Sequence, residues 1–218
     1  MHIHPSILNA DYANFARELD SISTADAAHV DVMDNHFVPN LTFGLGLVES
    51  LLKVTELPLD IHLMIENPET WAPAYAEAGA ASVTFHLEAA KDPISLARTL
   101  RTLGSRSAIA IKPDTPVADV VELLPEIDML LIMTVEPGFG GQSLIQSTLA
   151  KVAQARSEIR NSGLEIALQV DGGVTEDNIG ELASLGANVF VAGSAVFRNP
   201  DRNGQISKLR ALAKAHAS

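Results

Sequence analysis

Short apolar segments recur along the 218 residues of the chain and alternate with longer segments of helical pattern. They are rich in Ile, Val, Leu and Met and mostly lack strict polar alternation, which is typical of parallel strands buried on both faces. Their starts are 22 to 36 residues apart, which leaves room for one strand, one helix and two loops each time. The predicted strands are residues 3–8, 29–33, 59–64, 82–86, 107–111, 129–133, 165–170 and 189–192.

Helical patterns occupy most of the gaps between these strands. Pro93 and Pro116 stand just before two of them, where proline is tolerated, and Gly79 and Gly163 stand just after two others, where glycine ends helices. The predicted helices are residues 14–23, 71–78, 94–103, 117–124, 143–159 and 179–185.

This succession of strands and helices predicts one fold for the whole chain. Eight βα units in 218 residues match a compact (β/α)8 TIM barrel. An open doubly wound sheet is the alternative, but such a sheet gathers its ligands at one crevice, whereas the candidate site residues here come from many strands. No linker or low-complexity stretch interrupts the pattern, so residues 1–218 are predicted to form a single domain.

Composition narrows the classes of partner. The formal net charge of −12 argues against electrostatic binding to nucleic acid or to an anionic membrane. No apolar run approaches the ~20 residues of a membrane span, and the first residues lack the basic start and apolar stretch of a secretory signal. The absence of cysteine excludes disulfides and thiolate ligands. The sequence therefore predicts a soluble, cytoplasmic protein without nucleic-acid or membrane partners.

Two histidines and two aspartates stand at or near the ends of three predicted strands: His29, Asp31, His62 and Asp171. His29 and Asp31 are two residues apart, so the period of a strand sends both side chains to the same side. In a barrel, all four side chains can converge at one mouth. A lone strand histidine is equally well explained as a satisfied core residue, but unpaired buried carboxylates are costly. The set of two imidazoles and two carboxylates predicts one bound divalent transition metal ion.

Glycine-rich segments follow the last three predicted strands. After the sixth strand, the run Gly138, Phe139, Gly140, Gly141 lets the backbone approach a ligand closely, although a tight turn or a flexible lid would have the same composition. In (β/α)8 barrels, the loops after the seventh and eighth strands often bind phosphate together with a short helix. Neither glycine-containing segment, VDGGV at 170–174 or VAGSAVF at 191–197, contains a lysine or arginine. The predicted phosphate ligands are therefore the backbone N–H groups of Gly172, Gly173, Gly193 and Ser194.

Three methionines and one serine are also predicted to lie near the mouth: Met33, Met64, Met133 and Ser6. Methionine usually fills gaps in the core. The alternative is a floor that excludes water and places polarizable sulfur beside developing negative charge. Ser6 is a candidate hydrogen-bonding partner for a substrate or for a metal-bound water. His36 and His86 are interpreted as structural or supporting residues and not as metal ligands.

Seven motifs, in order along the chain, closely resemble the ribulose-phosphate 3-epimerase family. They are HPSILNAD at 4–11, HVDVMDNHFVPNLTFG at 29–44, IHLMIENP at 61–68, TFHLEA at 84–89, MTVEPGFGGQ at 133–142, VDGGV at 170–174 and AGSAVF at 192–197. The resemblance implies a homo-oligomeric (β/α)8 barrel with one divalent metal ion, zinc first and manganese, cobalt or iron as alternatives. It also implies interconversion of D-ribulose 5-phosphate and D-xylulose 5-phosphate in the pentose phosphate pathway.

The resemblance also implies roles for individual residues. The metal ligands of the family fall on His29, Asp31, His62 and Asp171, and its two acid/base residues fall on Asp31 and Asp171, one on each face of an enediolate intermediate. Its substrate contacts fall on Ser6, His62, Gly138, Phe139, Gly140, Gly141, Asp171, Gly172, Gly173, Gly193 and Ser194. The methionines of the family fall on Met33, Met64 and Met133, which favours a role for them in shielding the enediolate.

Two positions depart from the usual pattern of the family. Asn35 stands where glycine is more frequent, but asparagine tolerates left-handed backbone better than most residues. Asp114 also replaces a frequent glycine and adds negative charge near the end of the fifth strand. Neither position belongs to the metal or acid/base set, so the departures bear on substrate preference, because a related branch acts on D-allulose 6-phosphate.

Two further alternatives come from outside this branch. The first is another phosphate-binding barrel enzyme, such as a decarboxylase or a synthase of aromatic precursors. A decarboxylase of the orotidine type needs a lysine set between aspartates, and the segment HVDVMD has none. The second is a non-catalytic barrel that binds a metal or a sugar phosphate, which the intact pair of aspartates disfavours.

Overall fold

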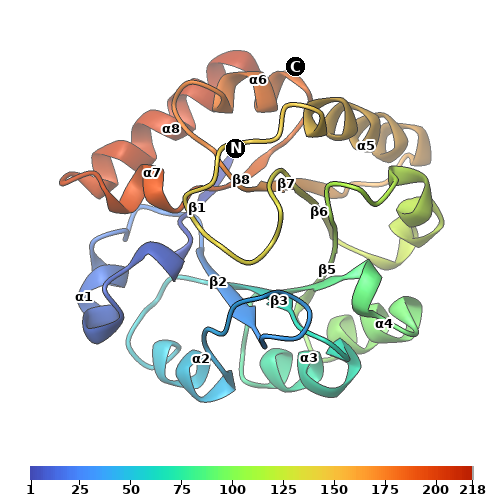
Figure 1. Ribbon diagram of the computed structural model, residues 1–218, viewed down its shortest axis with the longest axis horizontal. Coiled ribbons are helices and arrows are strands. Elements are labelled where there is room, and N and C mark those ends of the chain that lie inside the picture. The colour runs from blue at the N-terminus through green and yellow to red at the C-terminus, as the bar shows by residue number, and fades with distance from the viewer. Residues whose placement is uncertain (218) are drawn as a thin grey trace.

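Eight parallel strands form the centre of the molecule in a computed structural model that describes residues 1–217 (Figure 1). Their order in the sheet is β1-β8-β7-β6-β5-β4-β3-β2. Hydrogen bonding continues from the end of β1 to β2, because the His29 N–H donates to the Pro5 carbonyl at 2.9 Å and Ser6 pairs with His29 in a parallel bridge. The strands are β1 (His2–His4), β2 (Ala28–Met33), β3 (Leu59–Met64), β4 (Ser82–His86), β5 (Arg106–Ile111), β6 (Met129–Met133), β7 (Ala167–Asp171) and β8 (Val189–Val191). The predicted (β/α)8 barrel is confirmed.

Helices surround this sheet on its outer side (Figure 1). The α-helices are α1 (Phe15–Asp20), α2 (Leu45–Leu51), α3 (Pro68–Glu77), α4 (Pro93–Thr102), α5 (Thr148–Ser162), α6 (Ile179–Ser184), α7 (Ser194–Phe197) and α8 (Arg202–His216). The 3-10 helices are η1 (Ile7–Asn9), η2 (Tyr12–Asn14), η3 (Leu87–Ala89) and η4 (Val117–Glu126). Within residues 1–217, no helix has the length and apolar character needed to cross a membrane.

The first strand is shorter than predicted. It ends at His4 instead of continuing to residue 8, and the chain turns into η1. Pro5 has no N–H to donate to a sheet, and the Ser6 hydroxyl accepts a hydrogen bond from the Leu8 N–H at 3.3 Å as the cap of η1. This early turn places Ser6 at the end of the barrel that carries the predicted site.

The helical predictions also need correction. Residues 117–126 form a 3-10 helix instead of an α-helix, since Pro125 cannot donate a backbone hydrogen bond and disfavours α geometry just before it. The helix predicted from residue 143 begins at Thr148. Helices α2, α7 and α8 were not predicted, because α2 and α7 have only seven and four residues and the large apolar residues of α8 are sparse.

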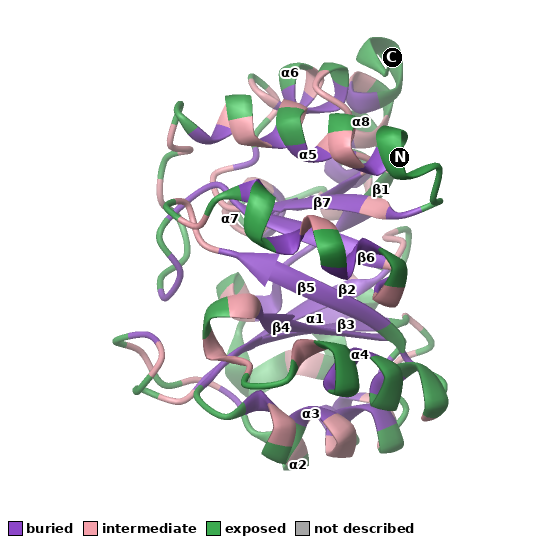
Figure 2. Cartoon of the chain, turned by 90° about the vertical axis from the view of Figure 1, so that its right-hand side faces the viewer, coloured by how far each residue is buried: buried purple, intermediate pink, exposed green. Residues whose placement is uncertain are grey.

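Alternation along the strands separates two environments. Outward residues such as Val30 and Val32 belong to the large apolar core between sheet and helices, whereas His29, Asp31 and Met33 point into the barrel. Figure 2 shows the strands almost entirely buried. The β2–β3 register places Asp31 beside His62 on the neighbouring strand, so the fold gathers polar side chains inside the barrel toward the carboxyl ends of the strands.

Candidate metal centre and active site

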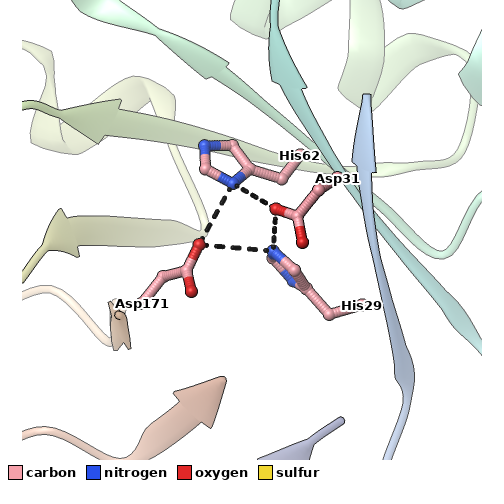
Figure 3. A group of neighbouring side chains, drawn as sticks. All are labelled: His29, Asp31, His62 and Asp171. Atoms are coloured by element: carbon pink, nitrogen blue, oxygen red, sulfur yellow. Dashed lines mark hydrogen bonds and ion pairs between the residues drawn. The ribbon is translucent and has the colours of Figure 1, made fainter. Parts of the chain in front are cut away.

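Four side chains converge inside the barrel at the carboxyl ends of β2, β3 and β7 (Figure 3). His62 Nδ1 lies 3.3 Å from Asp31 Oδ1 and 3.3 Å from Asp171 Oδ2. His29 Nε2 lies 3.4 Å and 3.7 Å from the same two oxygens. The four ligand atoms lie within 4.8 Å of one another, so a single ion could contact all of them. The structure therefore brings together the four residues predicted as metal ligands.

Mutual electrostatic interaction shifts the pKa values of these groups. Burial alone would raise the pKa of Asp31 and of Asp171, but His29 and His62 hold both pKa values below the ordinary 3.8. Burial alone would lower the pKa of both histidines, but Asp31 raises the pKa of His29 and Asp171 raises that of His62. The carboxylates thus favour positive charge at the positions of the two ring nitrogens.

The chemistry of the donor set fits a divalent cation. His29 Nε2 is buried and has no hydrogen-bonding partner among the described residues, and such groups are rarely left unsatisfied. Two imidazole nitrogens and two carboxylate oxygens suit zinc and several other first-row metals. A cation bound to His29, Asp31, His62 and Asp171 would satisfy this nitrogen and offset two buried negative charges.

A buried polar network supports His29 from the other side of its ring. His29 Nδ1 lies 2.9 Å from Asp60 Oδ2, which also lies 2.8 Å from His4 Nδ1 and accepts a hydrogen bond from Gln169 Nε2 at 2.7 Å. Asp60 Oδ1 accepts a hydrogen bond from the Ser82 hydroxyl at 2.5 Å. Asp60 was not predicted as a site residue, although it stands two residues before His62 on β3, the spacing that places both inside the barrel.

His62 is contacted on the other side of its ring by His86, the last residue of β4. Its Nε2 lies 3.0 Å from His86 Nε2, and His86 Nδ1 lies 3.1 Å from Glu88 Oε2. Burial lowers the pKa of His86 to about 4, so its ring is neutral near pH 7. Burial opposes ionisation of Glu88, but hydrogen bonds that include the one from His86 hold its pKa at about 2. His86 thus occupies the supporting position that the sequence suggested, and Glu88 was not predicted.

A cavity of about 400 Å³ lies above the four converging side chains. Its floor includes Asp31 and Asp171, whereas His29 and His62 are fully buried below it. All other residues of the predicted site line the cavity: Ser6, Met33, Met64, Met133, Gly138, Phe139, Gly140, Gly141, Gly172, Gly173, Gly193 and Ser194. The methionines are at most 3% exposed, so they present a narrow apolar border beside the carboxylates.

Ser6 and Asn9 position groups on the β1 side of the cavity. The Ser6 hydroxyl donates a hydrogen bond to Asp31 Oδ2 at 2.5 Å, which leaves Asp31 Oδ1 directed at the histidines. Asn9 lines the cavity between two glycines, and a Cβ at Gly193 would overlap its Oδ1 while one at Gly140 would lie 3.3 Å from it. Asn9 was missed by the sequence analysis, because nothing local distinguishes it from a surface asparagine.

The loop after β7 needs glycine at two consecutive positions. Gly172 and Gly173 have φ values of 121° and 66°. A Cβ at Gly172 would overlap the Val135 side chain, and one at Gly173 would overlap the Leu144 backbone. Among residues 1–217, the N–H groups of Gly173 and Gly193 donate to no protein acceptor. Both glycines line the cavity, so these N–H groups are candidate donors to a bound anion.

The loop at residues 138–141 is braced at its ends and exposed at its tip. Asn40 Nδ2 donates to the Gly138 carbonyl at 2.7 Å, and Gln142 Nε2 donates to the carbonyls of Glu136 at 2.7 Å and Phe139 at 2.8 Å. Phe139 is 55% exposed and lies at the entrance of the cavity. These contacts give the loop a defined anchorage, with one aromatic ring at the rim.

The two departures from the family pattern lie outside the centre. Asn35 has φ of 60°, which is the left-handed conformation expected at a glycine-preferring position. Asp114 is exposed in the turn after β5 and does not line the cavity. His36 is exposed, with its Nδ1 2.8 Å from the Asp34 carbonyl, and it is not part of the metal group.

The fold and site thus define a (β/α)8 barrel with a candidate divalent-metal centre at the bottom of a cavity at the strand ends. Residues 2–197 match the ribulose-phosphate 3 epimerase family. The ribulose-phosphate 3-epimerase of Mycobacterium tuberculosis is 50% identical over 213 residues, which cover 98% of this chain and 93% of that protein. The ribulose-phosphate 3-epimerase of Escherichia coli K12 is 42% identical over 97% of this chain and 96% of its own length. The chain therefore belongs to the ribulose-phosphate 3-epimerase family, a family of isomerases.

Solved structures of other barrels share the fold. The 3-hexulose-6-phosphate synthase of Salmonella typhimurium superimposes with a TM-score of 0.72 at 18% identity and covers 99% of this chain and 100% of its own. At this identity the likeness concerns the arrangement of strands and helices alone, and the side chains described above come from this chain.

Proposed function

We propose that this protein interconverts D-ribulose 5-phosphate and D-xylulose 5-phosphate by moving a proton at C3, as a step of the pentose phosphate pathway. The observation that carries the proposal is the convergence of Asp31 and Asp171 beside His29 and His62 at the floor of one cavity, in a chain of this family. Inversion beside a ketone needs a base on one face of the carbon and an acid on the other.

Asp31 and Asp171 are the proposed base and acid. They reach the centre from β2 and β7, on different sides of the site in Figure 3. One aspartate removes the C3 proton, which leaves a planar enediolate, and the other returns a proton to the opposite face. In the reverse direction the two exchange roles. The Asp31 and Asp171 side chains are 4% and 14% exposed, so bulk water has little access to the protons that they carry.

The proposed cofactor is one divalent ion, zinc first, held by His29, Asp31, His62 and Asp171. When bound, it would act as a Lewis acid that lowers the energy of negative charge on the enediolate oxygens. Met33, Met64 and Met133 line the same cavity and would exclude water from the enediolate. The Ser6 hydroxyl fixes Oδ2 of Asp31 and so holds Oδ1 toward His29 and His62, where the metal ion would bind.

The phosphate of the substrate is proposed to lie at the opposite end of the cavity, against the loops after β7 and β8. The backbone N–H groups of Gly173, Gly193 and Ser194 would donate to its oxygens, as is usual at this position of (β/α)8 barrels. An overall charge of −12 would repel a free anion, so such directed donors are needed to hold it. Phe139 and its loop would close over the sugar.

The experiment that tests the function is proton NMR of the metal-analysed protein in D2O with D-ribulose 5-phosphate. We expect deuterium at C3 together with the appearance of D-xylulose 5-phosphate. Removing the metal with a chelator should stop both, and adding it back should restore them. Protein with bound metal that gives neither exchange nor product would reject the pentulose proposal. D-allulose 6-phosphate is then the substrate to test, and failure there as well would favour a non-catalytic binding protein.

A further inference from the structure

The ring of His62 has one nitrogen directed to the metal centre and one directed away from it. Nδ1 lies 3.3 Å from the oxygens of both Asp31 and Asp171, and Nε2 lies 3.0 Å from His86 Nε2. Both rings are fully buried. A histidine that binds a metal ion is neutral, and a contact between two neutral imidazoles needs one N–H and one lone pair. The pair can therefore exist in two arrangements, which differ in the nitrogen of His62 that carries the proton.

The Glu88 carboxylate favours one of these two arrangements over the other. In the first, His62 Nε2–H donates to His86 Nε2, and His86 Nδ1–H donates to Glu88 Oε2 at 3.1 Å. His62 then offers the lone pair of Nδ1 to the centre. In the second, His86 Nε2–H donates to His62, and the lone pair of His86 Nδ1 faces the Glu88 carboxylate, which is repulsive. His62 would then direct an N–H at the centre, where it cannot bind a metal ion.

We propose that Glu88 is a positioning residue which, through His86, fixes the tautomer of His62 that presents Nδ1 to the metal centre. The inference rests on the proposed metal-dependent function. Neighbours of a metal ligand commonly fix its tautomer in this way. In the same centre, Asp60 contacts His29 Nδ1 directly at 2.9 Å. For His62, the carboxylate of Glu88 acts through the imidazole ring of His86, which lies between them.

The other hydrogen bonds of Glu88 would hold a glutamine at this position in one orientation. Glu88 Oε1 accepts hydrogen bonds from the Lys112 N–H at 2.7 Å and from the Thr115 hydroxyl. In Glu88→Gln, the amide oxygen must stay at this position to accept them, which directs the NH2 group at His86 Nδ1. An N–H donor at that position favours the second arrangement. The variant should therefore reverse the direction of the hydrogen bonds that join His62, His86 and residue 88, instead of merely removing one of them.

Glu69→Gln is the matched control. Glu69 Oε1 also accepts hydrogen bonds from two loop N–H groups, those of Lys91 at 2.5 Å and Asp92 at 3.2 Å. No histidine contacts the Glu69 carboxylate within residues 1–217. The substitution thus imposes the same loss of charge and the same rearrangement of an amide in the first turn of α3, near the same end of the barrel.

The readouts are the protonation pattern of the histidine nitrogens and the affinity for Zn²⁺. In the Zn²⁺-loaded protein, proton–nitrogen correlation spectra should show His62 protonated at Nε2 and His86 protonated at Nδ1. Chelator competition should give about 10- to 100-fold weaker Zn²⁺ binding for Glu88→Gln, and unchanged binding for Glu69→Gln. A merely structural role of Glu88 would lower the unfolding temperature without moving the proton on His86.

A proton on His86 Nε2 in the unsubstituted protein would overturn the proposal, and this measurement needs no variant to fold. Equal Zn²⁺ affinities for the protein and for a folded Glu88→Gln variant would also overturn it. Turnover of D-ribulose 5-phosphate by the unsubstituted protein is measured separately. If that turnover is absent, the proposed function fails, while the tautomer and the affinity still decide the role of Glu88.

Discussion

Asp60 Oδ2 lies 2.9 Å from His29 Nδ1, on the side of the imidazole ring opposite to the candidate metal centre. Both residues are completely buried. The contact means that the orientation of a predicted metal ligand is set by a side chain deeper in the barrel, which never reaches the cavity.

Replacing Asp60 should therefore affect stability as well as the metal centre. Asp60→Ala removes the acceptor for His4, His29 and Gln169. Since an unsatisfied buried donor costs about 1–3 kcal/mol, we expect the free energy of unfolding of the metal-free protein to fall by about 3 kcal/mol or more. Urea denaturation measures this. Ser82→Ala, which removes only one donor to the same carboxylate, should cost about 1 kcal/mol; equal losses would contradict the central role of Asp60.

The two proposed acid/base residues should be indispensable for turnover. Asp31→Asn and Asp171→Asn each keep an oxygen ligand but lose the ability to exchange a proton, and such groups contribute about 10²–10⁴-fold. Epimerisation and C3 deuterium exchange should both be measured, together with the metal content of each variant. Asp114→Asn, an exposed residue outside the cavity, serves as control. Near-normal turnover of either variant would rule out the two-aspartate scheme.

Gly193 is expected to control affinity for the phosphate. In Gly193→Val the added side chain would overlap Asn9 Oδ1 and crowd the adjacent N–H groups. We expect KM to rise by about tenfold, equivalent to about 1.4 kcal/mol, with a smaller change in kcat. Gly46→Ala, where a Cβ meets nothing within 4 Å, should leave steady-state kinetics unchanged. An unaltered KM for Gly193→Val would place the phosphate elsewhere.

The two methionines of β6 offer a paired test of the apolar floor. Met133 borders the cavity, whereas Met129 packs with Ala108 and Val189 at the opposite end of the strand. Leucine conserves volume at both positions, so each substitution should cost less than about 1.5 kcal/mol of stability. We expect only Met133→Leu to reduce kcat, by about fivefold, if sulfur contributes about 1 kcal/mol beside the enediolate. Equal kcat values in the two variants would assign Met133 to packing alone.

Asp26 links the amino end of β1 to α8 and should make stability depend on acid pH. It accepts from the Ile3 N–H at 2.8 Å and from Arg210 at 2.9 Å. Although burial opposes ionisation, these contacts lower the pKa of Asp26 below the ordinary 3.8. Its stabilisation is therefore complete above pH 3.8 and lost as the pH falls through the lowered pKa.

We expect Asp26→Asn to lower the free energy of unfolding by about 1 kcal/mol at pH 7, a modest value because the pair is partly exposed. The difference between the two proteins should shrink below pH 3.8. Denaturation across that range measures it, with Asp20→Asn, an exposed residue of α1, as control. A difference that persists unchanged in acid would show that the charge of Asp26 does not stabilise the fold.

Local pattern was sufficient for much of the architecture. The apolar runs located all eight strands, because parallel strands that are buried on both faces are rich in Ile, Val, Leu and Met. Asn35 was recognised as a residue suited to left-handed backbone, and its φ of 60° agrees. The four residues of the metal group were selected by type and by position at strand ends. Their roles in catalysis stay predictions.

Other features depend on contacts between segments that are far apart in the sequence. Asp60 accepts a hydrogen bond from Gln169, which is 109 positions away in the sequence. Asn9, near the start of the chain, lies against Gly193, near its end. Residues 143–147, predicted as helix, form part of the loop that follows the sixth strand, and Ser143, Leu144 and Gln146 line the cavity. No periodicity within a segment encodes such partners.

The sequence by itself therefore determined the repeated βα units, the barrel and the chemical types gathered at its carboxyl-terminal end. Only the tertiary structure decided which nitrogen of His62 faces the centre, and which carboxylate stands behind each histidine. The physical reason is that hydrophobic periodicity specifies which face of a strand is buried. The register between neighbouring strands and the closure of the barrel then specify which buried groups meet.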